Sequence, residues 1–346
     1  MTDRRLTPAG LRGFVADALR AAGVDELSAE GTARALLHAS LHGIDSHGVR
    51  LLPFYVQCLD DSLARRRPRV EVTQRRAAAA VVDADGGLGH RPSYRAMEVA
   101  CALARDAGIG MAAVVNSTHF GAAGAYALAA AEAGFMGLVV ANSGALVAPF
   151  DGRQPVHGTN PIAFAAPAAG RDPFLLDMAT SAIPWNRVLL SRKLGAPLPA
   201  ETALTPAGAF TEDAGAAMML APLGGRAFGY KGAGLAGMAE TLSGALTGMR
   251  LAYELDGTAL GDTDLGHLFV AVDPGVFAPA AEVAERVASY CARLAGMSGG
   301  GATVHPAGGP QWVARDDRTA NGIPVPAAVG SELEAVAQRF GLAWPP

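Results

Sequence analysis

The sequence predicts an α/β fold in two or three domains. From Val70 onwards, short apolar runs separated by glycine alternate with alanine-rich segments of helical spacing, which is the pattern of an α/β protein. Within residues 7–61, by contrast, the apolar residues show only the spacing of helices. The chain has 346 residues, of which half are apolar, and this is more than one ordinary core serves.

Two helices are expected within residues 7–61. Apolar positions recur there in two sets, Leu11, Phe14, Val15 and Leu19, then Ala33, Leu36, Leu37 and Leu41. Because residues three and four apart share a helix face, each set predicts one buried face. The segment 331–340 near the other end is again helical, with Ser331 as its N-cap, and we expect it to pack against the N-terminal helices.

Helices and strands alternate through the middle of the chain. A helix is predicted at 94–105, a buried strand at 111–115 and a helix at 121–133 that Gly134 closes. Residues 184–214 are rich in Pro, Thr and Ala without a clean period, which favours a long loop over the surface or over a cofactor. A helix at 235–246, a strand at 268–272 and a helix at 281–294 complete the pattern.

Composition narrows the function classes. A net charge of −4 provides no electrostatic footprint for nucleic acid or an anionic membrane, so we expect a small-molecule partner. Cys58, Cys101 and Cys291 lie far apart without a C-x-x-C pair, which supports neither a disulfide framework nor a zinc site. Since the N-terminus lacks the apolar run of a signal peptide and the longest apolar stretch, 135–150, contains polar residues, we expect a cytoplasmic protein.

A lone histidine, His119, is the first candidate for chemistry. It lies between the predicted strand at 111–115 and the predicted helix at 121–133. At a helix start, unpaired N–H groups and the helix dipole disfavour imidazolium, which would lower the pKa of His119 towards a value useful for proton transfer. Taken alone, the segment slightly favours a purely structural histidine that caps a turn.

A literal G-x-G-x-x-G occurs at 232–237, but it does not predict a Rossmann turn. That fingerprint requires a preceding hydrophobic strand, whereas RAFGYK precedes it here. One alternative is that Lys231 and the glycine-rich backbone open a helix and offer N–H groups and an ammonium to a phosphate. The other, about equally supported, is close helix packing that needs small residues.

Polar residues after the second helix form another candidate group. His47, beside Ser46 and a cation, could donate a proton, and the planar guanidinium of Arg50 could clamp a carboxylate. His38 and His42 are four residues apart, as in some metal sites, but no acidic partner completes a zincin-type site. We therefore assign them a structural role and predict no metal site.

Two further polar segments are expected to line a ligand cleft. GTNP at 158–161 supplies Thr159 and Asn160, and LDMATS at 176–181 is a strand that ends in hydroxyls and one carboxylate. The carboxylate of Asp177 fits three roles: a hydrogen bond to a ribose, orientation of a histidine, or a cap of the next turn. The residues alone leave all three open.

Taken together, these segments resemble the malate/L-lactate dehydrogenase family, which includes ureidoglycolate, sulfolactate and 2,3-diketogulonate-type dehydrogenases and cyclic ketimine reductases. The resemblance covers nearly the whole chain. It is carried by GIDSHGV at 43–49, HFG at 119–121, GTNP at 158–161, DMATS at 177–181, KG at 231–232 and GH at 266–267. Any one of these motifs is weak, but six in the family's order are specific.

The resemblance implies a homodimeric NAD- or NADP-dependent oxidoreductase of the α/β class. Its NAD(P)-binding domain would not be a Rossmann fold and would carry a mixed, largely antiparallel sheet, beside a helical domain built from both ends of the chain. The implied boundaries are 1–70 with 300–346 for the helical domain, 71–115 with 235–299 for a central α/β domain, and 116–234 for the NAD(P)-binding domain.

The resemblance also implies roles for single residues. His119, with His47 as competitor or relay partner and Ser46 beside it, would exchange a proton with the substrate during hydride transfer between nicotinamide and C2 of a 2-hydroxy or 2-oxo acid. Substrate contacts are expected from Arg50, Thr159 and Asn160. The positions matched to cofactor binding are Ser143, Asp177, Met178, Ala179, Thr180, Lys231 and Gly232. The alternatives are a cyclic imine carboxylate reductase and a catalytically silent dinucleotide-binding relative.

Two departures from the family's pattern bear on substrate and cofactor. Many members read Ser-His-Gly-x-x-Arg, but here the arginine is Arg50, one residue early, and Leu51 occupies its place. A shift of one residue on a helix turns a side chain by about 100°, so Arg50 would not clamp a substrate carboxylate as the family's arginine does unless the local backbone adjusts. We therefore expect an unusual substrate. After the Asp177 turn, PWNR at 184–187 replaces the small residues that the family usually has there. Arg187 or Arg192 could bind a 2′-phosphate, but this does not distinguish NADPH from NADH as the cofactor.

Overall fold

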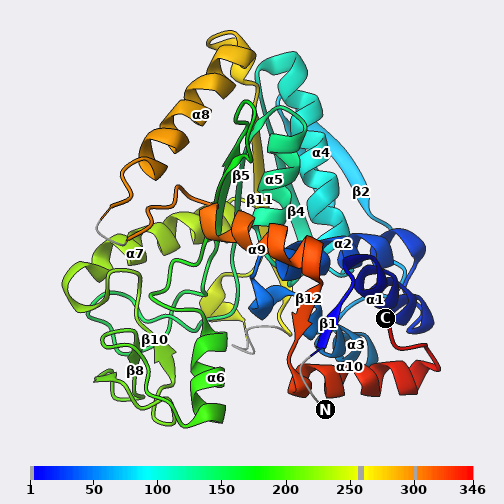
Figure 1. Ribbon diagram of the computed structural model, residues 1–346, viewed down its shortest axis with the longest axis vertical. Coiled ribbons are helices and arrows are strands. Elements are labelled where there is room, and N and C mark those ends of the chain that lie inside the picture. The colour runs from blue at the N-terminus through cyan, green and yellow to red at the C-terminus, as the bar shows by residue number, and fades with distance from the viewer. Residues whose placement is uncertain (1–3, 256–260, 300–301, 346) are drawn as a thin grey trace.

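The computed structural model describes residues 4–255, 261–299 and 302–345, and a seven-stranded sheet lies at its centre (Figure 1). The strands, in sheet order, are β2 Glu71–Arg76, β3 Ala79–Asp83, β4 Ile109–Thr118, β11 Thr263–Val272, β5 Met136–Ala141, β6 Ile162–Ala166 and β7 Phe174–Met178. β3 and β4 run parallel, and the other five neighbouring pairs are antiparallel. The predicted mixed, largely antiparallel sheet is confirmed.

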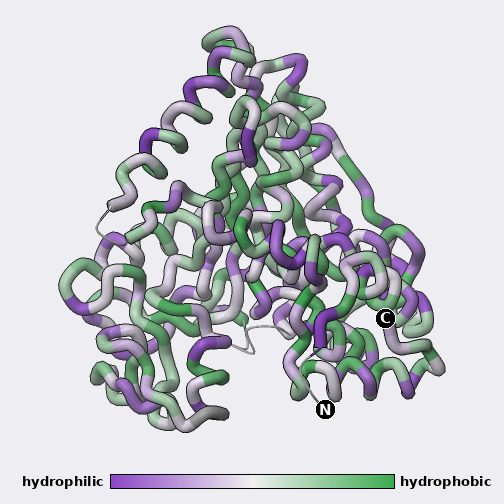
Figure 2. The backbone as a smooth tube through the Cα atoms, viewed as in Figure 1, coloured by the Kyte–Doolittle hydropathy of each residue, from purple (hydrophilic) through white to green (hydrophobic). Residues whose placement is uncertain are grey.

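Helices bury both faces of this sheet. Successive side chains on a strand point to opposite faces, and on β5 Val139 packs with Tyr126 of α5 (Gly124–Glu132) while Val140 packs with Ala239 of α7 (Gly225–Glu240). Helix α4 (His90–Ala107) lies beside α5 on the first face. Hydrophobic residues accordingly follow the central strands (Figure 2). β4 crosses the predicted boundary between residues 115 and 116, so the two predicted α/β domains share one sheet.

Both ends of the chain contribute to a second, helical core. It contains α1 Pro8–Ala21, α2 Glu26–Leu41, α3 Leu52–Asp60 and α10 Ala327–Phe340. The short strands β1 (Arg4–Leu6) and β12 (Ile323–Val325) pair beside them, and α9 (Gly309–Asn321) precedes β12. The expected packing of the tail on the N-terminal helices is confirmed. Ser331, however, is not the N-cap, because α10 begins four residues earlier and Ser331 donates to Ala327 O inside the helix.

The expectation of a long loop over 184–214 was wrong. This stretch contains α6 (Trp185–Leu194) and the strands β8 (Ala203–Leu204) and β9 (Phe210–Thr211), which form a small sheet with β10 (Met219–Leu220). A small core with Val188 and Leu220 holds the unit together. Strands of two residues are too short to leave a readable period, which is why the sequence pattern missed them.

The helix predicted at 235–246 begins ten residues earlier, because α7 spans Gly225–Glu240 and a π-helical turn follows at Thr241–Ala245. Lys231 and Gly232 therefore lie inside the helix and do not open it, which corrects the phosphate-binding alternative. A Cβ at Gly232 would lie 2.4 Å from the backbone N and O of Leu223. Gly232 thus serves close packing, whereas a Cβ at Gly234 would meet nothing within 4 Å, and the low helix propensity of the glycines concealed the helix.

The strand and the helix predicted after residue 246 are both confirmed, and the helix stands apart from the sheet. The strand expected at 268–272 lies within β11, and the helix expected at 281–294 is α8 (Ala280–Ala295). Cys291 is the buried residue of α8, which runs along the outside of the molecule (Figure 1, upper left). Among the described residues, no helix is long and apolar enough to cross a membrane.

Gly266→Ala is expected to destabilise the protein by about 3 kcal/mol, because an added Cβ on β11 would overpack a rigid contact. That Cβ would lie 1.8 Å from Ser243 O in the π-helical turn. Gly13→Ala in α1 is the matched control, since a Cβ added at Gly13 would meet nothing within 4 Å. Urea unfolding of both variants checks this, and equal stability of the two would contradict the packing role of Gly266.

Candidate active site

His119 lies in the connection between β4 and α5, as predicted. The chain turns there through Gly121, whose φ of +78° favours glycine. The Nδ1 atom of His119 has two neighbours: Tyr55 Oη at 2.6 Å and the backbone N of Gly121 at 3.4 Å. The ring is thereby held from one side.

The fold brings His47 onto His119 although the two are far apart in the sequence. Two 3-10 turns, Asp45–His47 and Val49–Leu51, follow α2 and carry Ser46, His47 and Arg50. The rings of His47 and His119 stack with their centroids 5.7 Å apart and an interplanar angle of 20°. Ser46 Oγ lies 2.8 Å from Nδ1 of His47, so the hydroxyl orients this second imidazole.

Both histidines are neutral at neutral pH. Burial lowers the pKa of His47 to about 4, and the nearby cation of Arg50 adds to the effect. Burial also lowers the pKa of His119 well below its usual range, with smaller contributions from His47 and His90. The direction agrees with the expectation for His119, but the cause is burial and not the start of a helix.

The displaced arginine still faces this region. Leu51 is 3% exposed and belongs to the helical core, whereas Arg50 is half-buried and its Nη2 donates to Asn186 Oδ1 at 3.2 Å. Asn186, from α6, also donates to Ser46 O at 3.4 Å. A 3-10 turn rotates successive side chains differently from an α-helix, which places Arg50 and not Leu51 beside His47.

Four polar residues predicted for cofactor or substrate form one hydrogen-bonded cluster. Ser143 Oγ accepts from Thr159 N at 3.2 Å, and Thr180 Oγ1 donates to Thr159 O at 3.1 Å. Asn160 is fully buried: its Oδ1 accepts from Ser143 N, and its Nδ2 donates to Glu240 Oε2 at 2.7 Å. The amide of Asn160 is thus committed to supporting the Ser143 loop from beneath.

Asp177 caps a helix. Its Oδ2 accepts from Gly124 N at 2.9 Å at the start of α5, and burial raises its pKa to about 6. The sequence left three roles open for Asp177, and the observed contact makes it a cap. The capped element is the helix α5, earlier in the chain, and not the turn that follows Asp177. Met178 and Ala179 follow it and are partly exposed.

Lys231 is exposed on α7, where its ammonium lies 5.1 Å from the ring centroid of Phe228. Within the described part of the chain, no contact joins it to the two stacked histidines. His38 and His42 stack on each other with centroids 4.1 Å apart, and His42 packs against Trp312, in keeping with a structural role.

Comparison with known proteins explains why these segments occur together. Residues 6–334 match the family model described as malate/L-lactate dehydrogenase. The chain belongs to this family. It is 34% identical over 342 residues to a malate dehydrogenase of Pyrococcus horikoshii, covering 95% of this chain and 93% of that protein. It is also 37% identical over 256 residues to a Delta(1)-pyrroline-2-carboxylate/Delta(1)-piperideine-2-carboxylate reductase of Pseudomonas putida, covering 71% and 74%.

The malate/L-lactate dehydrogenase fold is equally clear from solved structures. A malate dehydrogenase from Entamoeba histolytica matches with a TM-score of 0.94 at 25% identity, and the match covers 100% of both chains. The resemblance inferred from six motifs and the predicted fold class are confirmed. This is a family of dehydrogenases and reductases, so the chain is an enzyme of that kind.

In this family member, two buried side chains beside His119 were not predicted as site residues: Tyr55 of α3 and His90 of α4. Tyr55 is 1% exposed and His90 is fully buried. A signal was present, because Tyr55 shares a helix face with Leu52, Val56 and Leu59, and a polar group on a buried face requires a partner.

A small hollow lies beside His119. Its lining includes Phe54, Tyr55, Cys58, Leu88, Thr118, His119 and Asp262. Asp262 Oδ2 accepts from Gly144 N at 2.8 Å, so a residue of this lining also holds the loop that carries Ser143. Asp262 thus connects the lining of the hollow beside His119 to the loop that carries Ser143.

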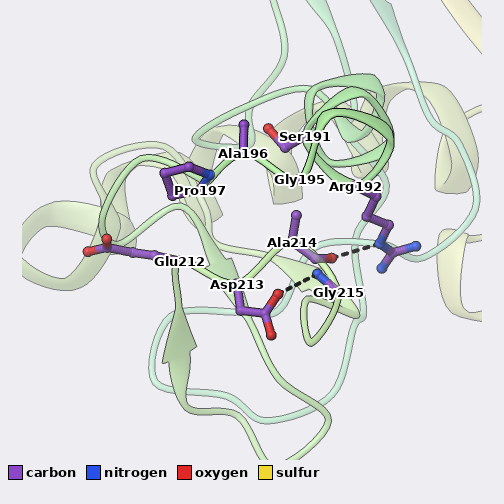
Figure 3. Close-up of a pocket in the computed structure, with 9 residues that line it drawn as sticks. All are labelled: Ser191, Arg192, Gly195, Ala196, Pro197, Glu212, Asp213, Ala214 and Gly215. Carbon is purple, nitrogen blue, oxygen red and sulfur yellow. Dashed lines mark hydrogen bonds between the residues drawn. The ribbon is translucent and has the colours of Figure 1, made fainter.

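A larger hollow of about 570 Å³ lies elsewhere, on the small unit, between α6 and residues 212–215 (Figure 3). It contains none of the residues predicted for catalysis or substrate. Arg192 lines it, and its Nε donates to Ala214 O at 2.7 Å, so the guanidinium holds the wall of the hollow. Both arginines considered for a 2′-phosphate are exposed, and the guanidinium of Arg192 also donates to Ala214 O and Ala217 O.

Proposed function

We propose that this protein is an NAD(P)-dependent oxidoreductase that transfers a hydride between nicotinamide and C2 of a small 2-hydroxy or 2-oxo acid, with His119 as proton donor and acceptor. The stacked, half-buried pair His47 and His119 beside the cation of Arg50 carries the proposal. A neutral imidazole presents one N–H to a substrate oxygen, and a guanidinium binds a carboxylate.

The residues proposed for the cofactor fit a dinucleotide by the chemistry of their donors. The hydroxyl of Ser143 and the ammonium of Lys231 suit ribose and phosphate oxygens, and the partly exposed backbone at Met178 and Ala179 offers further polar groups. Thr180 and Gly232 would act by holding these donors in place, since both are buried. When bound, the nicotinamide supplies the hydride.

Arg50 is proposed to bind the carboxylate next to the reacting carbon, with Thr159 at the edge of the same region. The named relatives act on carboxylates whose neighbouring carbon carries oxygen or a ring nitrogen. Asn160 is proposed to act through the Ser143 loop, because its own amide is committed. Reduction of a cyclic imine carboxylate is the second candidate, favoured by the Pseudomonas putida relative.

A substrate panel tests this function. Pyruvate, oxaloacetate and piperideine-2-carboxylate are each offered with NADH and with NADPH, and loss of reduced nicotinamide absorbance is followed. We expect turnover with a 2-oxo acid. Turnover confined to the cyclic imine would replace the leading function by the second candidate. Tight NADH binding without turnover across a wide panel would instead indicate a catalytically silent relative.

We further propose a homodimer located in the cytoplasm, and a three-part division in which the predicted central α/β domain and NAD(P)-binding domain are two halves of one continuous sheet. Large apolar side chains of α7 support the dimer, because Phe228, Tyr230 and Met238 are 57%, 53% and 42% exposed. Large exposed apolar side chains gathered on one helix are typical of a contact surface.

A further inference from the structure

Three buried polar side chains form a continuous hydrogen-bonded row that ends on His119. Thr32 Oγ1 of α2 lies 3.2 Å from His90 Nδ1, and His90 Nε2 lies 3.1 Å from Tyr55 Oη. Tyr55 Oη lies 2.6 Å from Nδ1 of His119. Thr32 and His90 are fully buried and Tyr55 is 1% exposed, so the row has no access to water.

The backbone of Gly121 sets the direction of this row. Its N–H donates to Nδ1 of His119, so that nitrogen is an acceptor and carries no proton. The hydroxyl of Tyr55 must then donate to the same Nδ1 and accept from Nε2–H of His90. His90 is neutral, since burial lowers its pKa to about 3, and its Nδ1 accordingly accepts from the hydroxyl of Thr32.

We propose that Tyr55, oriented by His90 and Thr32, is a positioning residue that acts together with the N–H of Gly121: the two donors hold His119 in the tautomer with its proton on Nε2, and the short bond from Tyr55 is the stronger of the two. His119 then presents an N–H, and not a bare nitrogen, away from the row. The inference rests on the proposed function: a resting N–H donor is set to polarise a carbonyl or imine, which is the reduction direction. Oxidation would require a bare nitrogen to accept the hydroxyl proton.

The alternative direction has a clear structural cost. If Nδ1 of His119 held the proton, Tyr55 would donate to His90 Nε2 and His90 Nδ1 would donate to Thr32. Every bond of the row would still be made, but the N–H of Gly121 would face another N–H at 3.4 Å. A buried donor without an acceptor costs more than an ordinary hydrogen bond contributes, which favours the first direction.

The tautomer is measured directly by 15N–1H correlation spectra of histidine-labelled protein, with the His119 signals assigned from their loss in His119→Gln. We expect the Nε2–H tautomer in the wild type and a shift towards a tautomer mixture in Tyr55→Phe. Tyr94→Phe is the matched control, a buried tyrosine outside the row, and it should leave the His119 signals unchanged. A wild-type Nδ1–H tautomer, or no change in Tyr55→Phe, would overturn the proposal.

Kinetics supply the second readout. Tyr55→Phe should lower kcat for reduction about tenfold with little change in KM, because one hydrogen bond that orients the imidazole is lost. His90→Gln keeps an N–H donor for Tyr55 and should retain most of kcat, whereas His90→Leu should behave like Tyr55→Phe. Equal losses in both His90 variants would contradict the lock. Because the spectra need no turnover, a locked tautomer in an inactive protein would contradict the proposed function alone.

Discussion

Replacing His119 by alanine is expected to lower kcat by about 10²- to 10⁴-fold, the usual contribution of a positioned general acid or base. The dissociation constant of the nicotinamide cofactor should change only a few-fold, because the residues proposed to hold it lie in the Ser143 cluster and on α7. Steady-state kinetics together with a fluorescence titration of NADH or NADPH check the two parts.

The control for this substitution is His47→Ala, which removes the stacked partner and its contact with Ser46. We expect a smaller loss there, because His119 and not His47 ends the row from Tyr55. If the turnover of His119→Ala stays within a few-fold of wild type, His119 is not the proton donor. A large loss confined to His47→Ala would move the role to that residue.

The free energy of unfolding should fall steeply as the pH drops below about 6.5. Burial lowers the pKa of His47 to about 4, that of His90 to about 3 and that of His267 to about 4, from 6.5 in the unfolded chain. Between the folded and unfolded pKa values, the unfolded state binds protons that the folded state does not bind, so the free energy of unfolding decreases as the pH falls. These three histidines alone give a slope of up to about 4 kcal/mol per pH unit, and His119, whose pKa burial also lowers, adds to it.

One buried carboxyl opposes this trend. The pKa of Asp177 is raised from 3.8 to about 6, so between those values the folded state binds one proton more than the unfolded state. The single proton bound by Asp177 offsets only part of the protons bound by the unfolded histidines, so the free energy of unfolding still decreases as the pH falls. Urea unfolding at several pH values between about 7 and 5 measures the slope. His267→Gln should reduce it, the exposed His305→Gln should not, and a flat profile would contradict the assignment of neutral buried histidines.

Elements with long runs of regular spacing were predictable from the sequence, and elements built from glycine or from very short strands were not. The helical faces of α1 and α2 and the apolar run of β4 are visible because burial on one side imposes a period. The helix α7 was predicted to begin ten residues late, since its glycines depress its apparent helix propensity, and one of them, Gly232, is needed for the close contact with Leu223.

The motifs of the site were predictable from the sequence, but the arrangement of their residues in space was not. Ordered motifs identified His47 and His119, while their stacking depends on how the 3-10 turn at Asp45–His47 lies against the segment after β4, which no local pattern records. The displaced Arg50 could not be placed from an α-helical rotation, because the backbone there makes a 3-10 turn. Tyr55 and His90 were overlooked since each looks like an ordinary member of a helix face.

The rate of hydride transfer in a single turnover tests the central claim most directly, because it separates the chemical step from product release. Wild-type and His119→Ala protein, each saturated with reduced cofactor, are mixed rapidly with the best substrate of the panel, and the nicotinamide absorbance is followed. We expect a loss of about 10²-fold or more in that rate for His119→Ala. A rate equal to that of the wild type would contradict it.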